Sequence, residues 1–304
     1  MFCIALGGPT IHAGGSASIV LAKRRGPIAI RQHNTEVSIE LLHVERTDQG
    51  VVIAGHGVRV DLVEHLFAAI GGLGIGADLR IDVFGPEIPI LDGSASKFSQ
   101  HLRHLRLPRR PHAPRIVMPA TIQTGDSTYC FTPSSKTQIT ARVEFDHPLI
   151  VEKQAQWDGD PDDFINRIAP ARTFGFRRDA MQLRQAGRAQ FIDPRVVVVL
   201  NDDGSSESAP APDECVRHKL LDLIGDLTIA GGVPIGTIEA TRPGHRATHA
   251  ALSIARTRGI LAYSTRGTTG TDGSSPSDGG GGGGNGAGGR YDGGSTGGSV
   301  GGSN

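Results

Sequence analysis

Residues 213–227, which read DECVRHKLLDLIGDL, are the stretch on which the interpretation of this chain depends. Apolar residues recur at helical intervals and Gly231-Gly232 follows, so the pattern predicts a helix over residues 213–229. His218 and Asp222 are four residues apart and therefore lie on one face of that helix. One imidazole and one carboxylate form half of a metal site, because a catalytic zinc ion needs three protein ligands and a water molecule. The pattern alone occurs often by chance, so a third ligand has to be found elsewhere.

A glutamate and a histidine stand side by side near the start of another predicted helix, residues 61–70. Glu64 and His65 offer a general base and a metal ligand. The spacing of Asp61 and Glu64 also fits a capping box, in which Glu64 would only stabilise the helix start. The chain has neither an HExxH nor a CxxC motif, so zincin-type metalloproteases and the usual structural zinc modules are excluded.

Two further segments carry candidate chemistry. In Pro243-Gly244-His245, the glycine allows a sharp turn in a loop after a strand, which presents the imidazole. Asp226 lies two turns after His218 and could orient His245 and favour its charged form. In residues 171–176, the hydroxyl of Thr173 lies between a cation and two aromatic rings. The alternatives are a surface histidine and a strand end with core phenylalanines.

The overall composition argues against several classes of protein. Basic and acidic residues each number 31, so charge predicts no nucleic-acid or anionic-membrane partner. No run of 18 apolar residues occurs, and we expect no integral membrane segment. The start of the chain has no basic stretch before its short apolar run, which disfavours a signal peptide and favours a cytoplasmic protein. Cys3, Cys130 and Cys215 are too few and too scattered for a disulfide framework.

Segments rich in proline or glycine divide the chain. Residues 108–114 contain three prolines, which neither a helix nor a central strand tolerates. We therefore expect a linker there, between an N-terminal domain of residues 1–107 and a C-terminal domain of residues 115–265. Residues 266–304 hold 18 of the 43 glycines and show no hydrophobic period, so we expect a disordered tail.

Both halves mix strands with helices. Further helix-like periodicity covers residues 96–107. The segments that are strand-like by β-branched content or alternation are residues 16–21, 51–53, 79–83, 115–118, 137–145, 196–200 and 236–240. The pattern predicts an α+β fold, with a sheet plus helices in each half, rather than a strict βαβ alternation.

The order of these motifs resembles that of a known enzyme family. The matching segments are VEHLFAAIGGLGI (63–75), GPEIPILDGSA (85–95), EFDHPLI (144–150), ARTFGF (171–176), DECVRHKLLDLIGDL (213–227) and GHRA (244–247). Together they resemble the zinc-dependent UDP-3-O-acyl-N-acetylglucosamine deacetylases, which catalyse the committed step of lipid A biosynthesis. The resemblance implies two similar α+β domains packed face to face, with the active site in the cleft between them.

The resemblance also implies a role for each candidate residue. His65, His218 and Asp222 would bind Zn²⁺. Glu64 would be the general base and His245 the general acid, with Asp226 as the partner of that acid. Thr173 would donate a hydrogen bond to the oxyanion. Lys219, Phe174 and Arg242 would bind the substrate. The expected substrate is a nucleotide-sugar lipid precursor, whose acyl chain would lie in a passage built by an insert at about residues 174–212. We expect a monomer with no nucleic-acid partner.

The chain departs from the family pattern in four places: its start, its insert, Asp61 where the family usually has a hydroxyl residue at the helix cap, and a glycine-rich tail that the family does not match. Few residues precede Gly8, so either an edge strand is lost or the start of the chain is assigned too late. A Gly-Gly-Ser turn usual in the insert is replaced by residues 190–194. Two alternatives to the deacetylase therefore stay open: a divergent paralogue that binds zinc or ligand without turnover, and a deacetylase of a different acylated amino sugar.

Overall fold

A computed structural model describes residues 3–109, 113–185, 187 and 193–263 of the chain. Its first half contains a five-stranded sheet in the order β1-β2-β8-β3-β4, in which only β3 and β8 are parallel neighbours. The strands are β1 (Cys3–Pro9), β2 (Ser16–Lys23), β3 (Ala29–Gln32), β4 (Thr35–Ser38) and β8 (Leu79–Phe84). Strand β1 pairs with β2 along its whole length, so the edge strand is present and the expectation of its loss is wrong.

The second half repeats this topology. Its five-stranded sheet has the order β10-β11-β16-β12-β13, and only β12 and β16 are parallel neighbours. The strands are β10 (Ala120–Thr124), β11 (Ser127–Thr132), β12 (Thr137–Arg142), β13 (Gln154–Trp157) and β16 (Gly236–Thr241). In both sheets the strand that comes last in sequence lies in the middle. The predicted α+β class is confirmed. The two five-stranded sheets share one strand topology, which agrees with the prediction of a sheet plus helices in each half.

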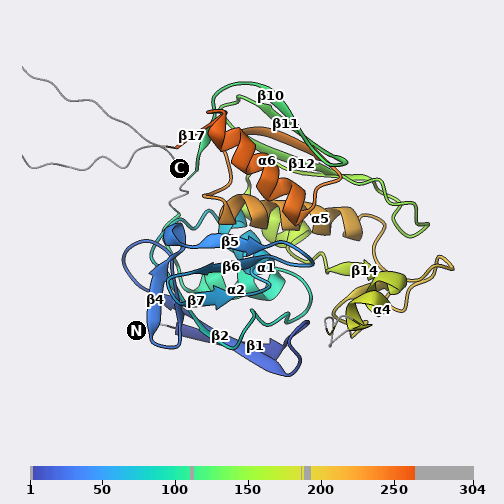
Figure 1. Ribbon diagram of the computed structural model, residues 1–304, viewed down its shortest axis with the longest axis horizontal. Coiled ribbons are helices and arrows are strands. Elements are labelled where there is room, and N and C mark those ends of the chain that lie inside the picture. Colours follow the sequence, from blue (N-terminus) through green and yellow to red (C-terminus); the bar gives the residue numbers. More distant parts are fainter. Residues whose placement is uncertain (1–2, 110–112, 186, 188–192, 264–304) are drawn as a thin grey trace, which may run out of the picture. The chain divides into compact units, whose positions relative to one another are not determined.

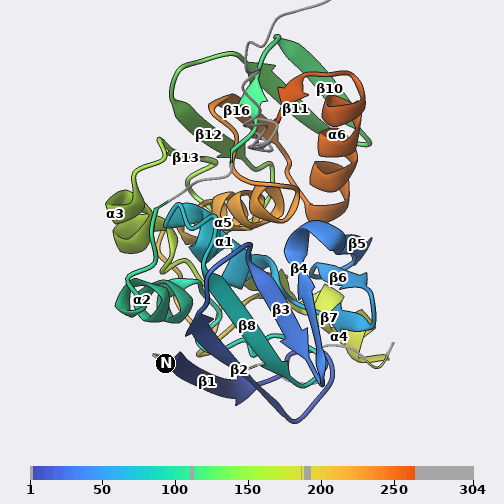
Figure 2. The ribbon, with the colours of Figure 1, turned by 90° about the vertical axis from the view of Figure 1, so that its left-hand side faces the viewer.

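Two helices lie between the sheets, α1 (Glu64–Gly72) and α5 (Glu214–Ile229) (Figures 1 and 2). They pack against each other without an intervening side chain at Gly225, where an added Cβ would lie 2.4 Å from the carbonyl oxygen of Glu64. Almost every residue of both helices is buried. Because neither helix has a wide polar face, both belong in the interior of the protein rather than at its surface.

The remaining elements surround this centre. The smaller helices are α2 (Ser96–His104), α3 (Pro161–Asp163), α4 (Arg177–Gln185) and α6 (His245–Thr257), with a 3₁₀ turn η1 (Ile39–Leu41) and a π-helical turn η2 (Phe164–Ile168). The smaller sheets are formed by β5 (His43–Arg46), β6 (Val52–Gly55) and β7 (Val58–Val60), by β9 (Arg115–Ile116) and β17 (Leu261–Ala262), and by β14 (Phe174–Phe176) and β15 (Val198–Leu200). None of the described helices is long and apolar enough to cross a membrane.

The start of α1 differs from its prediction. The helix begins at Glu64 rather than at Asp61, and the capping-box alternative is wrong. The carboxylate of Asp61 instead accepts a hydrogen bond from the backbone of Leu62 and pairs with Arg46. The Glu64 carboxylate accepts from the backbone N–H of Val51, so it is free of any capping role.

The predicted domain limits remain predictions. Residues through Ser264 form one compact unit by themselves, and two similar sheets lie on either side of the expected linker at residues 108–114. Residues 110–112 of that linker and the expected tail at 266–304 lie outside the described residues. The insert at residues 174–212 contains β14, α4 and β15. Most of its departing segment, residues 190–192, lies outside the described residues too.

Candidate active site

Three candidate metal ligands converge from two helices. His65 comes from the first turn of α1, whereas His218 and Asp222 come from successive turns of α5. The Nε2 atoms of His65 and His218 lie 3.8 and 3.4 Å from Oδ1 of Asp222. One ligand atom from each residue lies within 4.8 Å of the other two, and all three side chains are buried. The structure thus brings together the three residues that sequence analysis proposed as ligands.

The hydrogen bond of His218 to the backbone leaves the inner ring nitrogen of this residue without a proton. His218 donates Nδ1–H to the carbonyl oxygen of Ala171 at 3.1 Å, so the lone pair of its neutral ring is on Nε2. Burial, followed by repulsion from His218, lowers the pKa of His65 to about 3, and burial also lowers the pKa of His218. Both rings are therefore neutral at physiological pH.

The carboxylate between the two imidazoles is ionised. Burial opposes the charged form of Asp222, but the cation of Lys219 and the nearby imidazoles hold its pKa well below the usual range. Its Oδ2 accepts a 2.9 Å hydrogen bond from Nζ of Lys219, and its Oδ1 faces the histidines. The lone pair of His218 and a negative oxygen thus face each other in a buried space beside the neutral ring of His65, an arrangement that a cation would stabilise.

Donor types and spacing both suit a divalent transition metal. Two ligand atoms bound to one tetrahedral zinc ion are about 3.3 Å apart, close to the separation of His218 from Asp222. Neutral imidazole and carboxylate are ligands for zinc and for iron(II) alike. The set contains three protein ligands, which is the number typical of a catalytic site rather than of a closed structural one.

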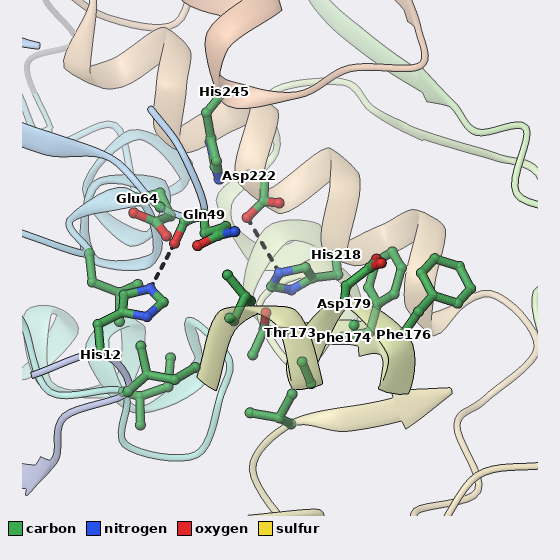
Figure 3. Close-up of a pocket in the computed structure, with 18 of the residues that line it drawn as sticks. His12, Gln49, Glu64, Thr173, Phe174, Phe176, Asp179, His218, Asp222 and His245 are labelled. Carbon is green, nitrogen blue, oxygen red and sulfur yellow. Dashed lines mark hydrogen bonds and ion pairs between the residues drawn. The ribbon is translucent and has the colours of Figure 1, made fainter. Parts of the chain in front are cut away.

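Glu64 lies beside the ligand cluster (Figure 3). Burial raises the pKa of its carboxyl to about 7, although the charge of His245 and the hydrogen bond from Val51 act in the opposite direction. One carboxylate oxygen accepts that hydrogen bond at 2.9 Å, and Glu64 forms part of a cavity wall. A carboxylate that is held in place with a pKa near neutrality can accept a proton in one step and release it in the next.

His245 and Asp226 form the second acid–base pair. Nδ1–H of His245 donates to the two carboxylate oxygens of Asp226 at 3.0 and 3.1 Å. Burial favours the neutral ring, but the charge of Asp226 and its hydrogen bond outweigh that effect and raise the pKa of His245 to about 9. His245 is the first residue of α6, not part of a loop as predicted, and Gly244 before it has an ordinary extended conformation. The ring is thus protonated at neutral pH, as a general acid requires.

Glu64, the three candidate ligands and His245 line one cavity of about 620 Å³. Glu64, His218, Asp222 and His245 lie at one end, and Thr173 and Phe174 form part of the wall (Figure 3). The ring of Phe174 meets that of His218 edge-on, with 6.1 Å between centroids. Beyond Phe174 the cavity continues between β14, α4 and β15, where it is lined by apolar side chains such as Leu183, Val197 and Val199.

The two predicted cationic substrate contacts lie in different places. Lys219 lines the cavity and is only 15% exposed. Burial disfavours its charge, but Asp222 outweighs burial and raises its pKa. Arg242 does not line this cavity, and its guanidinium lies 3.7 Å from the carboxylates of Asp126 and Glu144 at the surface. The role of Arg242 therefore stays a prediction without a contact to the other candidate residues.

Four polar residues near the site are not indicated by the sequence motifs. His12 and Gln49 line the cavity, and Nε2 of His12 lies 2.8 Å from the carbonyl oxygen of Gln49. Glu87 is buried and accepts backbone hydrogen bonds from residues 11–13, which holds the loop that carries His12. His249 contacts Asp226. Its four-residue spacing from His245 was a usable signal, whereas the loop contacts join residues that are far apart in sequence.

Comparison with known proteins agrees with this geometry. Residues 3–255 match the family model described as LpxC: UDP-3-O-acyl N-acetylglycosamine deacetylase. Curated proteins named UDP-3-O-acyl-N-acetylglucosamine deacetylase are similar to the chain. The one from Myxococcus xanthus is 35% identical over 260 residues, covering 80% of this chain and 81% of that protein. Those from Anaeromyxobacter dehalogenans and Brucella melitensis biotype 2 are 33% and 32% identical, covering 84% and 80% of this chain and 84% and 89% of those proteins. The chain therefore belongs to the UDP-3-O-acyl N-acetylglycosamine deacetylase family.

Proposed function

We propose that the chain hydrolyses the N-acetyl group of a UDP-3-O-(3-hydroxyacyl)-N-acetylglucosamine, releasing acetate in a zinc-dependent reaction of lipid A biosynthesis. The observation that carries the proposal is the convergence of three metal-type ligands, a carboxylate base and a histidine acid on one cavity, in a member of this deacetylase family. We also propose that the chain acts as a monomer in the cytoplasm.

His65, His218 and Asp222 would hold the zinc ion. Their neutral imidazoles and ionised carboxylate match its preferred donors, and the hydrogen bonds to His218 and Asp222 orient the ligand atoms toward one point. Zinc would supply Lewis-acid chemistry to the acetyl carbonyl and lower the pKa of water to about 7. Its positive charge would also remove the repulsion among the three inward-facing ligand atoms.

Glu64 is the proposed general base. Amide hydrolysis needs water to lose a proton as it attacks the acetyl carbon, and the Glu64 carboxylate lies beside the ligand cluster with room in the cavity in front of it. A positioned base typically contributes about 10²–10⁴ in rate. The hydrogen bond from Val51 leaves a second carboxylate oxygen available to accept the proton.

His245 is the proposed general acid, and Thr173 the proposed oxyanion donor. The amide nitrogen leaves only after protonation, and Nε2 of the His245 imidazolium is free to supply that proton because Nδ1 is bound to Asp226. The Thr173 hydroxyl would donate to the oxygen that gains negative charge. A cationic His245 and Lys219 at the same end of the cavity further stabilise that charge.

The shape of the cavity agrees with an amphiphilic substrate. The polar end holds the proposed acid–base groups, and the apolar continuation past Phe174 would receive the acyl chain. Lys219 is the proposed contact for the charged part of the substrate on the polar side. Phe174 separates the two regions and packs against a ligand, so it would position the acylated sugar relative to the reacting amide.

Acetate release tests the proposal. Purified zinc-loaded protein is assayed beside Glu64→Ala and His245→Ala, and we expect the wild type to be faster than both by at least about 10². If wild type and variants release acetate equally slowly, the chain is a paralogue that binds without turnover. If only another acylated amino sugar is deacetylated, the chemistry stands and the substrate assignment fails.

A further inference from the structure

The carboxylate of Asp226 lies within hydrogen-bond distance of two imidazoles, those of His245 and His249. Its Oδ1 lies 3.0 Å from Nδ1 of His245 and 3.2 Å from Nε2 of His249. The carboxylate is 1% exposed, so water does not compete with these donors. Burial opposes its charge, but His245 and then His249 outweigh burial and lower the pKa of Asp226. One ionised oxygen is therefore shared between the proposed general acid and a second histidine.

The local structure explains how both rings reach the same carboxylate. His245 opens α6 and His249 lies one turn later, so their side chains project from the same face. Thr248, between them, hydrogen-bonds with the hydroxyl of the buried Tyr129 at 2.9 Å and ties this turn to the second sheet. The arrangement is thus held by the backbone of the helix and by a buried contact, not by the histidines alone.

The two rings open onto different cavities. His245 lines the catalytic cavity, whereas His249 lines a second cavity of about 760 Å³ between α6 and β5 and is absent from the catalytic lining. The charged and titratable side chains that share this second cavity are Glu40, His43, Glu45, Arg46, Arg246 and Arg256. Tyr263 also lines it. Lys219 and Tyr129 interact with Asp226, and Asp222 and Glu64 act on His245. His249 contacts Asp226, which in turn binds His245 of the catalytic cavity.

We propose that His249 is a positioning residue for the general acid, holding Oδ1 of Asp226 through its Nε2–H and drawing part of that oxygen's charge away from His245. The proposal rests on the deacetylase function proposed above. With two donors on one oxygen, the carboxylate keeps one orientation and binds the His245 imidazolium less tightly than it would alone. The acid is therefore both fixed in place and able to release its proton.

A matched pair of substitutions tests this role. In His249→Gln the side-chain amide reaches the place of Nε2, whereas in His249→Asn it ends near the place of Nδ1 and cannot reach Asp226. For His249→Asn we expect kcat to fall about tenfold, as for loss of a hydrogen bond to a charged group, with KM unchanged. The alkaline limb of the pH profile should move upward by about half a unit, since Asp226 then holds the His245 proton more strongly. His249→Gln should restore both values.

The control is Ser253→Ala, on the same helix and in the same second cavity but without a contact to Asp226, and it should behave as wild type. An unmoved alkaline limb in His249→Asn, equal behaviour of the Asn and Gln variants, or a change confined to KM would each overturn the proposal. Loss of the fold in either variant, measured by thermal melting, would show a packing role and overturn it too.

A second readout separates this proposal from the proposed function. The titration of the His245 ring is followed by NMR in zinc-loaded wild type and His249→Asn. A higher pKa in the variant supports the role of His249 even if the wild type releases no acetate, in which case only the deacetylase assignment fails. An unchanged titration rejects the role of His249 whatever the activity.

Discussion

At the scale of single residues, two acid–base groups in one cavity have pKa values shifted for different reasons. The carboxyl of Glu64 reaches about 7 because burial disfavours its charge. His245 reaches about 9 because Asp226 outweighs burial and stabilises its charge. Between these values the proposed base, Glu64, is free to accept a proton and the proposed acid, His245, still carries one, which is the combination that amide hydrolysis needs.

The first prediction concerns Glu64. Glu64→Gln keeps the size and the hydrogen bond from Val51 but cannot accept a proton, so we expect kcat to fall about 10²–10⁴. Zinc content, measured by atomic absorption, should stay at one ion per chain because Glu64 is not a ligand. A variant that keeps more than a third of the wild-type kcat would show that another group is the base.

The second prediction concerns pH. Since the acid must be protonated, kcat should fall tenfold per unit above about pH 9 in the wild type. Asp226→Asn removes the charge that raises this pKa, and burial, which lowers it, is left unopposed. The alkaline limb should therefore move downward, to below about pH 7. The pH profile of kcat measures the shift, and a limb that stays near pH 9 would exclude Asp226 as its cause.

At the scale of elements, the site depends on the close contact between α1 and α5. The backbone of α5 at Gly225 meets that of α1 at Glu64, one residue before the proposed ligand His65. The separation of the helices therefore sets the distance from His65 to His218 and Asp222. A glycine in the middle of a helix costs stability relative to alanine, so its presence here indicates that the approach itself is needed.

The third prediction tests this contact. Gly225→Ala places a methyl group 2.4 Å from a backbone oxygen that cannot rotate away, so the helices must separate. We expect an overpacking cost of about 1–3 kcal/mol in unfolding free energy and a weaker affinity for zinc. Denaturant titration and competition with a chelating dye measure the two effects. Gly7→Ala, where the added atom makes only ordinary contacts of 3.6 Å, is the control and should change neither.

The beginning of α1 shows what element-level patterns cannot predict. The spacing of Asp61 and Glu64 suits a capping box, but Arg46 binds Asp61 and Val51 binds Glu64. Both partners come from β5 and the residue before β6, brought there by the three-stranded sheet. Leu62 between them takes a left-handed conformation with φ of 60°, which starts the helix later than the pattern suggests. Local spacing could not reveal these longer-range contacts.

At the scale of the whole molecule, the proposed metal site connects the two halves of the chain. His65 follows the first sheet's early strands, and His218 and Asp222 precede the last strand of the second sheet. Anything bound by all three residues therefore links the halves. A ligand that binds only the folded state stabilises it in proportion to its affinity and concentration.

The fourth prediction follows from this link. Removing the metal with a chelator should abolish acetate release and lower Tm, and zinc should restore both. At 100 times the dissociation constant the stabilisation is about 2.7 kcal/mol. His65→Ala should lose the zinc-dependent part of Tm, whereas His104→Ala, an exposed residue of α2, should retain it. A Tm that is indifferent to zinc in the wild type would reject the proposed site.

The sequence by itself determined the residue types and local spacing: the i,i+4 pair His218 and Asp222 on a helix, the adjacent Glu64 and His65, and the alternation of the strands. These depend on backbone periodicity, which is local. Only the tertiary structure decided that His65 meets His218, that Val51 holds Glu64, and that Asp226 is shared by two histidines, because these contacts join segments that only the packing of α1, α5 and α6 brings together. The shifts in pKa are likewise decided by the tertiary structure, since burial and charge partners exist only after folding.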